Sequence, residues 1–251
     1  ALYGNELSGS VTRLEKYAAC AFAHFVSYGL GLLERQEYRL AVPDIGNIFH
    51  KAIDLFSKKV KNSQYEWYSI PDEVREQFTK EAVEEAAVDY GNQVILSSKR
   101  NSYMLERVMR ITTQVRKGRF EPEAFELQFS FLDNLDTVNV ELAQDARMQL
   151  QGRIDRVDIY EEPEKNRFLV KVIDYKSGHS SLDMGQIFYG LQLQLVVYLS
   201  ASMELQQKKN PDHKIEPAGV FYYNIDDPIV DKTSDVETAI LKELRMNGLV
   251  N

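Results

Sequence analysis

Two apolar runs on either side of a short polar loop constrain the fold of this chain more than any other feature. Residues 148–159 and 167–175 carry apolar side chains at strand-like spacing, and residues 161–166 between them are charged and turn-forming. Two strands joined by so short a loop pair as an antiparallel hairpin. Gly152 interrupts the first run, as expected where a strand bulges or another part of the chain approaches closely. The centre of the chain therefore predicts a β-sheet.

Helical periodicity flanks this hairpin on both sides, which predicts an α/β fold with a mixed central β-sheet and helices around it. The predicted helices begin at a Ser10 or Thr12 cap with Glu15 in the first turn, run from Asp44 to about Lys61 and from Asp72 toward Tyr90, and cover residues 102–117, 190–208 and 235–246, the last ended by Asn247-Gly248. Further strands are predicted over residues 124–132 and 219–223. We expect a single domain, 1–251, with a mainly helical part (1–120) and an α/β core (121–251).

The two strands of the hairpin each carry an acidic residue in an apolar setting. Asp174 and Lys176 are two residues apart, so they project from the same face of their strand, and Asp155 on the preceding strand can lie opposite them. A solvated surface charge is the ordinary explanation of any one acid. Asp174, however, ends an apolar run, where a charge is costly unless it is paired or bound to a cation. Carboxylates of this kind hold Mg²⁺, which activates water, and a neighbouring lysine can orient that water or offset developing charge. The set favours a metal-dependent site that cleaves phosphodiesters.

Two other segments contribute polar residues whose ordinary explanation is structural. His50 follows Gly46 by one helical turn, and taken alone it is a packing histidine. Gln194 and Tyr198 are four residues apart, so they share one face of a predicted helix. Taken alone they are ordinary polar residues on a buried helix.

In their order along the chain, these residues resemble the RecB-type branch of the PD-(D/E)XK nucleases. The motifs are Gly46-x-x-x-His50, Gly152-x-x-Asp155, Asp174-x-Lys176 and Gln194-x-x-x-Tyr198. The resemblance implies a restriction-endonuclease-like core that cuts DNA with Mg²⁺ or Mn²⁺. It implies metal ligation by His50, Asp155, Asp174 and the backbone carbonyl of Tyr175. It also implies that Lys176 is the catalytic lysine, supported by Gln194 and Tyr198.

Residues 10–22 give a narrower resemblance, to the start of the nuclease domain in the B subunits of AddAB helicase–nucleases. The resemblance implies that Cys20 is one of four cysteine ligands of a [4Fe–4S] cluster in a full-length protein. The other three cysteines are absent here, and Ala21 stands where the family usually has proline. We therefore expect a fragment of a larger bacterial, cytoplasmic protein, in which Cys20 is a small buried residue. The implied partners are single-stranded DNA fed by a helicase during double-strand break repair and recombination, and a helicase–nuclease A subunit.

The composition limits the remaining classes of protein. The longest apolar stretch, 191–201, falls short of the roughly 18 residues of a membrane span. The first ten residues lack the basic start and apolar core of a signal peptide. A single cysteine excludes an internal disulfide framework and is compatible with a reducing cytoplasm. A net charge of −8 is unusual for a DNA-binding protein, although carboxylates around a metal ion account for part of it.

Two alternatives stay open from the sequence. One is a catalytically inactive nuclease-like module that binds DNA or serves as a scaffold; such a module should lack His50, Asp174 or Lys176, all of which are present. The other is a different enzyme or an unrelated acidic interaction domain. The chain has neither a Walker loop nor a Gly-x-Gly-x-x-Gly fingerprint, and one cysteine with scattered histidines does not supply a tetrahedral zinc site.

Overall fold

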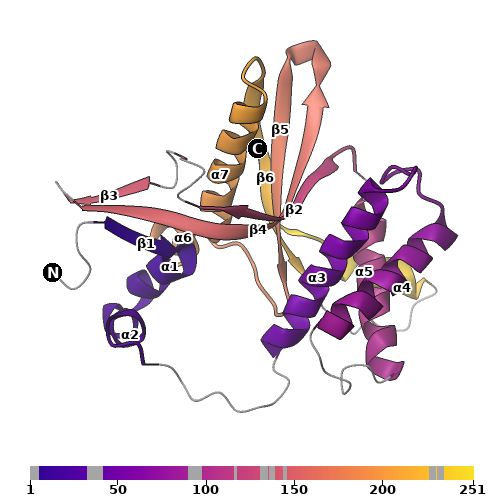
Figure 1. Ribbon diagram of the computed structural model, residues 1–251, viewed down its shortest axis with the longest axis horizontal. Coiled ribbons are helices and arrows are strands. Elements are labelled where there is room, and N and C mark those ends of the chain that lie inside the picture. The colour runs from indigo at the N-terminus through magenta and orange to yellow at the C-terminus, as the bar shows by residue number, and fades with distance from the viewer. Residues whose placement is uncertain are drawn as a thin grey trace.

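The structure is a computed structural model that describes residues 6–32, 42–89, 98–115, 118–130, 135, 139–143, 146–225, 230 and 235–251. Figure 1 shows the arrangement of its helices and strands. The helices are α1 (Val11–Ala19), α2 (Ala21–His24), η1 (Phe25–Gly29), α3 (Val42–Lys61), α4 (Asp72–Asp89), α5 (Ser98–Val115), η4 (Pro163–Lys165), α6 (Met184–Phe188), α7 (Gln194–Lys209) and α8 (Val236–Glu243). The strands are β1 (Glu6–Ser10), β2 (Glu121–Phe129), β3 (Asn139–Ala143), β4 (Ala146–Glu162), β5 (Arg167–Lys176), β6 (Lys214–Asn224) and β7 (Asn247–Val250).

The strands form a mixed sheet in the order β1-β4-β5-β6-β7, with β2 and β3 also paired to β4. The 17-residue β4 joins the two ends of this sheet: its first half pairs with β1 and β3, and its second half with β2 and β5. Strands β4 and β5 form the predicted antiparallel hairpin, whereas β5 and β6 are parallel. The prediction of a mixed central sheet flanked by helices is confirmed.

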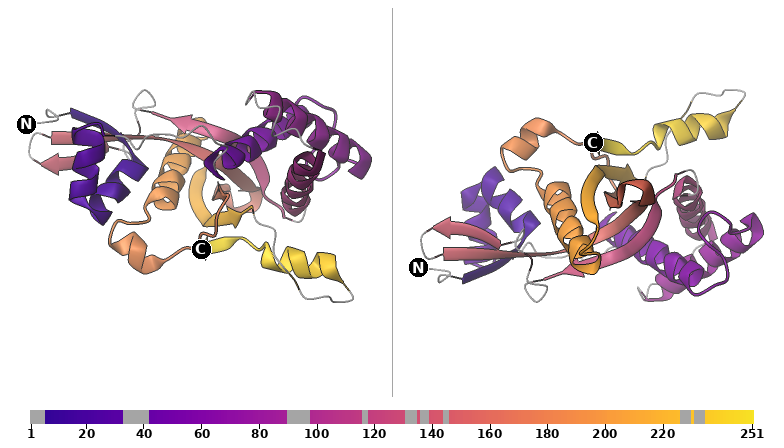
Figure 2. Two further views of the ribbon diagram at one scale, coloured as in Figure 1. Left: turned by 90° about the horizontal axis from the view of Figure 1, so that it is seen from below. Right: turned by 90° about the horizontal axis from the view of Figure 1, so that it is seen from above.

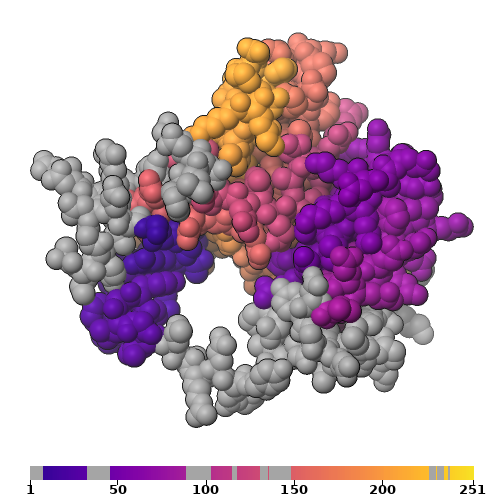
Figure 3. All heavy atoms as spheres, viewed as in Figure 1, coloured from indigo at the N-terminus to yellow at the C-terminus, as the bar shows by residue number. Residues whose placement is uncertain are grey.

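Alternate side chains of β5 enter two separate cores on opposite faces of the sheet. Val170 and Val172 pack with α7, whereas Ile173 and Tyr175 pack with α3 and α5. Figure 2 shows α3, α4 and α5 gathered at one end of the molecule, with α1 and α2 at the other. In Figure 3 helix α7, in orange, rises between these two groups of helices. The sheet thus receives helices on both faces.

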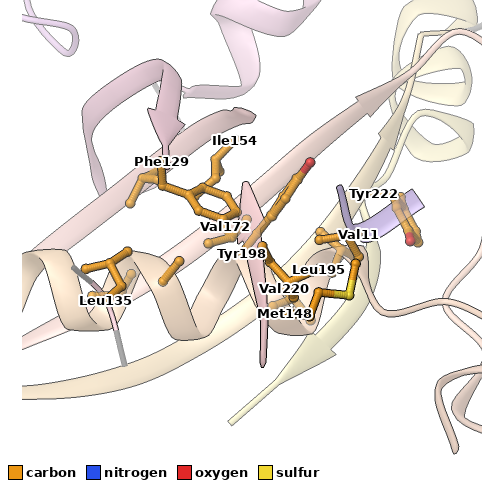
Figure 4. Packing of buried hydrophobic residues seen from close by; sticks show 14 residues of the cluster. Val11, Phe129, Leu135, Met148, Ile154, Val172, Leu195, Tyr198, Val220 and Tyr222 are labelled. Atoms are coloured by element: carbon orange, nitrogen blue, oxygen red, sulfur yellow. The ribbon is translucent and has the colours of Figure 1, made fainter. Parts of the chain in front are cut away.

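The core beneath α7 also includes residues from the N-terminal segment. Figure 4 shows Leu195 and Tyr198 of α7 among side chains of the sheet, with Val11 at the start of α1 close by. Tyr198 packs edge-on against Phe129 of β2, with ring centroids 5.8 Å apart. This packing fixes the start of α7, which carries Gln194, relative to the strands.

Several predicted boundaries need correction. Helix α1 begins as predicted after Ser10, whose side chain accepts a hydrogen bond from the Arg13 N–H, but Glu15 makes no capping box with Thr12. Helix α3 begins at Val42, so Asp44 lies in its first turn rather than capping it. Helix α5 begins four residues before the predicted Ser102, and β6 extends over 11 residues instead of the predicted five. Residues 90, 116–117 and 131–132 of the predicted elements lie outside the described residues.

The predicted end of the last helix is wrong in a different way. Helix α8 stops at Glu243, and Asn247-Gly248 opens strand β7, which pairs with β6. Elements β1, β3 and α6 were not predicted; β1 places a strand inside the part expected to be mainly helical. Across the described part of the chain, no helix has both the length and the apolar character needed to cross a bilayer.

Candidate active site

The hairpin β4–β5 brings the two predicted aspartates together. Its register pairs Arg156 with Ile173 as the last pair of the antiparallel ladder, so the next residues, Asp155 and Asp174, lie opposite each other. Both are buried, at 7% and 2% exposure. The Tyr175 N–H donates a 2.7 Å hydrogen bond to Oδ2 of Asp155, and the Lys176 Nζ lies 2.6 Å from Oδ2 of Asp174. The backbone of β5 therefore orients one acid while its side chains supply the other acid and the lysine.

Helix α3 brings His50 to the same place. A Cβ atom on Gly46 would lie 3.2 Å from the Oγ of Ser177, so the absence of a side chain there lets α3 approach the end of β5 closely. One turn further on, His50 Nδ1 lies 3.3 Å from Oδ1 of Asp155 and 3.3 Å from Oε1 of Glu126. The Gly46 and His50 motif thus combines a close-contact position with a potential metal donor.

Glu126 is a site residue that the sequence analysis missed. It lies on β2, whose register pairs Phe125 with Arg156 and Leu127 with Ile154, and so faces Asp155. Its φ of 49° breaks the regular strand geometry. By simple alternation with its apolar neighbours Glu126 reads as a solvent-facing residue, and only the register between β2 and β4 would have identified it. Arg153 Nε also lies 2.7 Å from its other oxygen.

The electrostatics of the cluster reflect three acids close together. Burial raises the pKa of Asp174 well above its ordinary value, and the charge of Asp155 raises it further, whereas Lys176 and His50 oppose the shift. Burial alone would lower the pKa of His50, but Asp155 and Glu126 outweigh it and raise the pKa to about 10. Without a metal, a protonated imidazole therefore serves as a counter-ion for the acids.

The donor set fits a divalent cation. One ligand atom from each of His50, Glu126 and Asp155 lies within 4.8 Å of the others. Among the residues that the structure describes, buried His50 Nδ1 and Asp174 Oδ2 have no aligned hydrogen-bond partner. Their charged neighbours are Lys176 for Asp174, and Asp155 with Glu126 for His50. Carboxylate oxygens with one imidazole nitrogen suit Mg²⁺ or Mn²⁺, and a cation bound here would replace the His50 proton as the counter-ion of the acids.

Helix α7 supplies a second contact to Lys176, in addition to Asp174. The Lys176 Nζ donates to the Oε1 of Gln194 over 2.9 Å, and the Gln194 Nε2 donates to the Tyr198 hydroxyl over 3.1 Å. A Cβ atom on Gly152 would lie 2.8 Å from the Phe129 ring and 3.0 Å from Tyr198, so only glycine fits at that position. The glycine of the Gly-x-x-Asp motif thus lets β4 pack beneath Tyr198.

A buried polar network supports the hairpin on the opposite face. Arg156 donates from Nε and Nη2 to the two carboxylate oxygens of Asp158, each over 2.5 Å, and from Nη1 to the Tyr175 hydroxyl over 3.2 Å. Lys171 Nζ lies 2.8 Å from Asp158. The Tyr175 ring meets the His50 ring edge-on, with centroids 6.0 Å apart. Tyr175 therefore connects this network to the acid cluster in two ways: its ring contacts His50, and its backbone N–H donates to Asp155.

One hollow of about 330 Å³ is lined by every residue predicted for the metal and catalytic roles. These are His50, Asp155, Asp174, Tyr175, Lys176, Gln194 and Tyr198. The start of α1 also lines it, through Ser10, Val11 and Thr12.

Cys20 lies outside this hollow, and the expectation that it is buried is wrong. It is exposed, and its Sγ accepts a 3.5 Å hydrogen bond from the Ala23 N–H at the start of α2. A thiol in a capping position points along the end of the helix instead of into a core.

Comparison with known proteins agrees with this architecture. The sequence pattern of the PD-(D/E)XK nuclease superfamily matches residues 8–249. The B subunit of an ATP-dependent helicase/deoxyribonuclease from Lachnoclostridium phytofermentans is 52% identical over 100% of this chain and 21% of its own length. Proteins of the same name from Alkaliphilus metalliredigens and Alkaliphilus oremlandii are 39% and 38% identical over 99% of this chain and 22% and 23% of their own lengths.

The chain spans about a fifth of the length of these relatives, so the relatives' names describe much larger proteins. The superfamily match, by contrast, covers nearly the whole chain and agrees with its mixed, helix-flanked sheet of restriction-endonuclease-like type. This protein belongs to the PD-(D/E)XK nuclease superfamily.

Proposed function

We propose that this chain is the nuclease domain from the B subunit of a helicase–nuclease and that it hydrolyses phosphodiester bonds of DNA with the help of a divalent metal ion. The observation that carries the proposal is the convergence of His50, Asp155, Asp174 and Lys176, from distant parts of the sequence, on one hollow. Acids, an imidazole and an ammonium group in one confined site are the components of metal-assisted phosphoryl chemistry.

The residues divide into two roles. His50, Asp155 and Asp174, with the backbone carbonyl of Tyr175, would hold Mg²⁺ or Mn²⁺, and Glu126 is placed to join them. When bound, such an ion lowers the pKa of water and offsets charge on the phosphate. Lys176, held by Gln194, presents its ammonium group to the hollow, where it orients the attacking water and stabilises negative charge as it develops.

The substrate and partners follow from the relatives and from the resemblance of residues 10–22. We assign single-stranded DNA delivered by a helicase as the substrate, with a role in repair and recombination of broken DNA in the bacterial cytoplasm. The partner is a helicase–nuclease A subunit. In the full-length protein, Cys20 would bind a [4Fe–4S] cluster, and its exposure leaves the sulfur free to ligate iron.

A cleavage assay tests the proposal. Single-stranded and duplex oligonucleotides labelled at either end are incubated with the chain in Mg²⁺, in Mn²⁺ and in EDTA. We expect metal-dependent cutting with preference for the single strand, and a loss of roughly a hundredfold or more in Asp174→Ala and Lys176→Ala. Asp235→Ala is the matched control, because Asp235 is an exposed carboxylate that caps α8 far along the chain from the site.

Two outcomes would count against the proposal. Equal cutting by Asp174→Ala and the wild type would show that Asp174 is not needed for cleavage and would contradict the proposed metal-assisted mechanism. Metal-independent DNA binding without any cutting would instead favour the alternative of an inactive nuclease-like module.

A further inference from the structure

The first turn of α7 is capped by a residue from the other end of the chain. Its own N-cap residue, Leu193, offers no side-chain hydrogen bond. Instead, Glu15 of α1 accepts hydrogen bonds at one oxygen from the Leu193 N–H over 2.7 Å and from the Gln194 N–H over 3.0 Å, across a separation of 178 residues to Leu193. The first amides of a helix have no intrahelical partners, and a carboxylate also interacts favourably with the positive end of the helix dipole. Glu15 therefore fixes where α7 begins.

The residue that Glu15 holds by its backbone is the residue that holds the lysine. The Gln194 N–H donates to Glu15, while the Gln194 side chain accepts from Lys176 and donates to Tyr198. Lys176 and Glu15 also share Tyr222 as a neighbour. Lys176 Nζ lies 5.4 Å from the centre of the Tyr222 ring, and burial followed by the charges of Asp174 and Glu15 raises the pKa of the Tyr222 hydroxyl.

We propose that Glu15 is a positioning residue for Lys176, acting through the first turn of α7 and the side chain of Gln194. The inference rests on the proposed nuclease function and adds to it a role for α1. Lys176 is the only member of the series Glu15–Gln194–Lys176 that we assign to the reacting phosphate; the other two set the direction of its ammonium group. Loss of Glu15 should therefore slow cleavage without weakening metal binding, because none of the assigned metal donors lies on α1 or α7: His50, Glu126 and Asp155 lie on α3, β2 and β4, and Asp174 lies on β5.

Four variants isolate this effect: Glu15→Ala, Glu15→Gln, Gln194→Ala and the double variant Glu15→Ala/Gln194→Ala. We expect a fall of roughly 10-fold in the single-turnover cleavage rate of Glu15→Ala, typical of a lost supporting contact, and a smaller fall in Glu15→Gln, which keeps an acceptor oxygen but no charge. The Mg²⁺ concentration for half-maximal rate should not change. The double variant should be no slower than Gln194→Ala, because both changes break the same series of contacts.

Asp183→Ala is the matched control. Asp183 is also a carboxylate that caps a helix, accepting from the Gly185 and Gln186 amides of neighbouring α6, a helix without site residues. The control should cut at the wild-type rate, which separates loss of a helix cap in general from loss of this cap.

Hydrogen exchange supplies a readout that does not depend on cleavage. In Glu15→Ala and Glu15→Gln the Leu193 and Gln194 amides should exchange faster than in the wild type, while amides in the middle of α7 stay protected. Wild-type cutting by both Glu15 variants, unchanged exchange at these amides, or multiplied rate losses in the double variant would each overturn the inference. If the wild type does not cut DNA, the proposed function fails and the exchange result alone decides whether Glu15 fixes the start of α7. If Glu15→Ala does not fold, Glu15→Gln carries the comparison.

Discussion

At the scale of single residues, the charges that the proposed chemistry needs lower the stability of the metal-free fold. Asp174 is 2% exposed and shares its surroundings with Asp155, so its ionised form is unfavourable in the metal-free protein. Residues kept in such an unfavourable state are typical of functional sites, where replacement stabilises the fold and removes the activity.

Asp174→Asn tests this conflict. The amide keeps the shape of the carboxylate but not its charge, so we expect the free energy of unfolding in EDTA at pH 8 to rise by ~1 kcal/mol or more. Cleavage should be lost at the same time. Urea denaturation of both proteins measures the first effect, and the oligonucleotide assay measures the second. A variant less stable than the wild type at pH 8 would contradict the account of the acid cluster.

His50 gives a prediction about pH. Its folded-state pKa of about 10 exceeds the ordinary 6.5, so the folded protein binds the proton more tightly than the unfolded chain does. The stabilisation is complete below about pH 6.5 and is lost as the pH rises toward about 10. Without divalent ions, the stability of the wild type should fall over this window by at most about 1.4 kcal/mol per pH unit relative to His50→Gln. Parallel stability curves for the two proteins would contradict it.

The residues of the site differ in how far sequence could identify them. His50, Asp155, Asp174 and Lys176 occupy fixed spacings from glycines or from each other, and those spacings reflect strand and helix geometry. Glu126 has no such spacing. It reaches the site through a strand register and a positive φ, and neither is encoded in a local pattern.

At the scale of elements, β5 gives the clearest agreement between sequence and structure. Its apolar run, the polar loop before it and the acid at its end predict a buried strand in an antiparallel hairpin, which the structure contains. Strand β7 shows why other elements were missed. Asn247-Gly248 is also a helix stop signal, but here Gly248 allows close pairing, since a Cβ atom there would lie 2.0 Å from the carbonyl oxygen of Val220. An edge strand of four residues is defined by its partner more than by its own sequence.

Tyr175→Phe tests how β5 is anchored. The change removes the hydroxyl that accepts from Arg156 and leaves a buried guanidinium nitrogen without that partner. We expect urea denaturation to show a loss of about 1–3 kcal/mol in the free energy of unfolding. Metal binding should be retained, because phenylalanine keeps the backbone N–H that orients Asp155.

Tyr223→Phe is the matched control for that experiment. Tyr223 is equally buried, at 3% exposure, and its ring packs against Tyr175 with centroids 5.8 Å apart. Its hydroxyl makes no hydrogen bond to Arg156 within the described structure, so its removal should cost less than the Tyr175 change. Equal losses in the two variants would show that the Arg156 contact contributes nothing specific.

At the scale of the whole molecule, the donor set connects elements that the chain keeps far apart. His50 comes from α3, Glu126 from β2, Asp155 from β4 and Asp174 from β5. The helical region and the sheet therefore meet at this cluster of like charges. A cation bound by donors from all four elements would favour the folded state, because the unfolded chain does not hold them together.

Metal binding should therefore appear as thermal stabilisation of the whole chain. Mg²⁺ or Mn²⁺ at a hundredfold excess over Kd should add about 2.7 kcal/mol to the free energy of unfolding and raise Tm accordingly. At one fixed metal concentration the increase should be larger at pH 8 than at pH 6, because the metal must displace the proton of His50, whose pKa is raised to about 10. Asp155→Ala should abolish the increase, whereas Asp183→Ala should retain it, since Asp183 caps α6 and contributes no donor. An equal rise in Tm for Asp155→Ala and the wild type would place the bound ion elsewhere on this acidic chain, and the cluster would then be a set of buried charges without a shared cation.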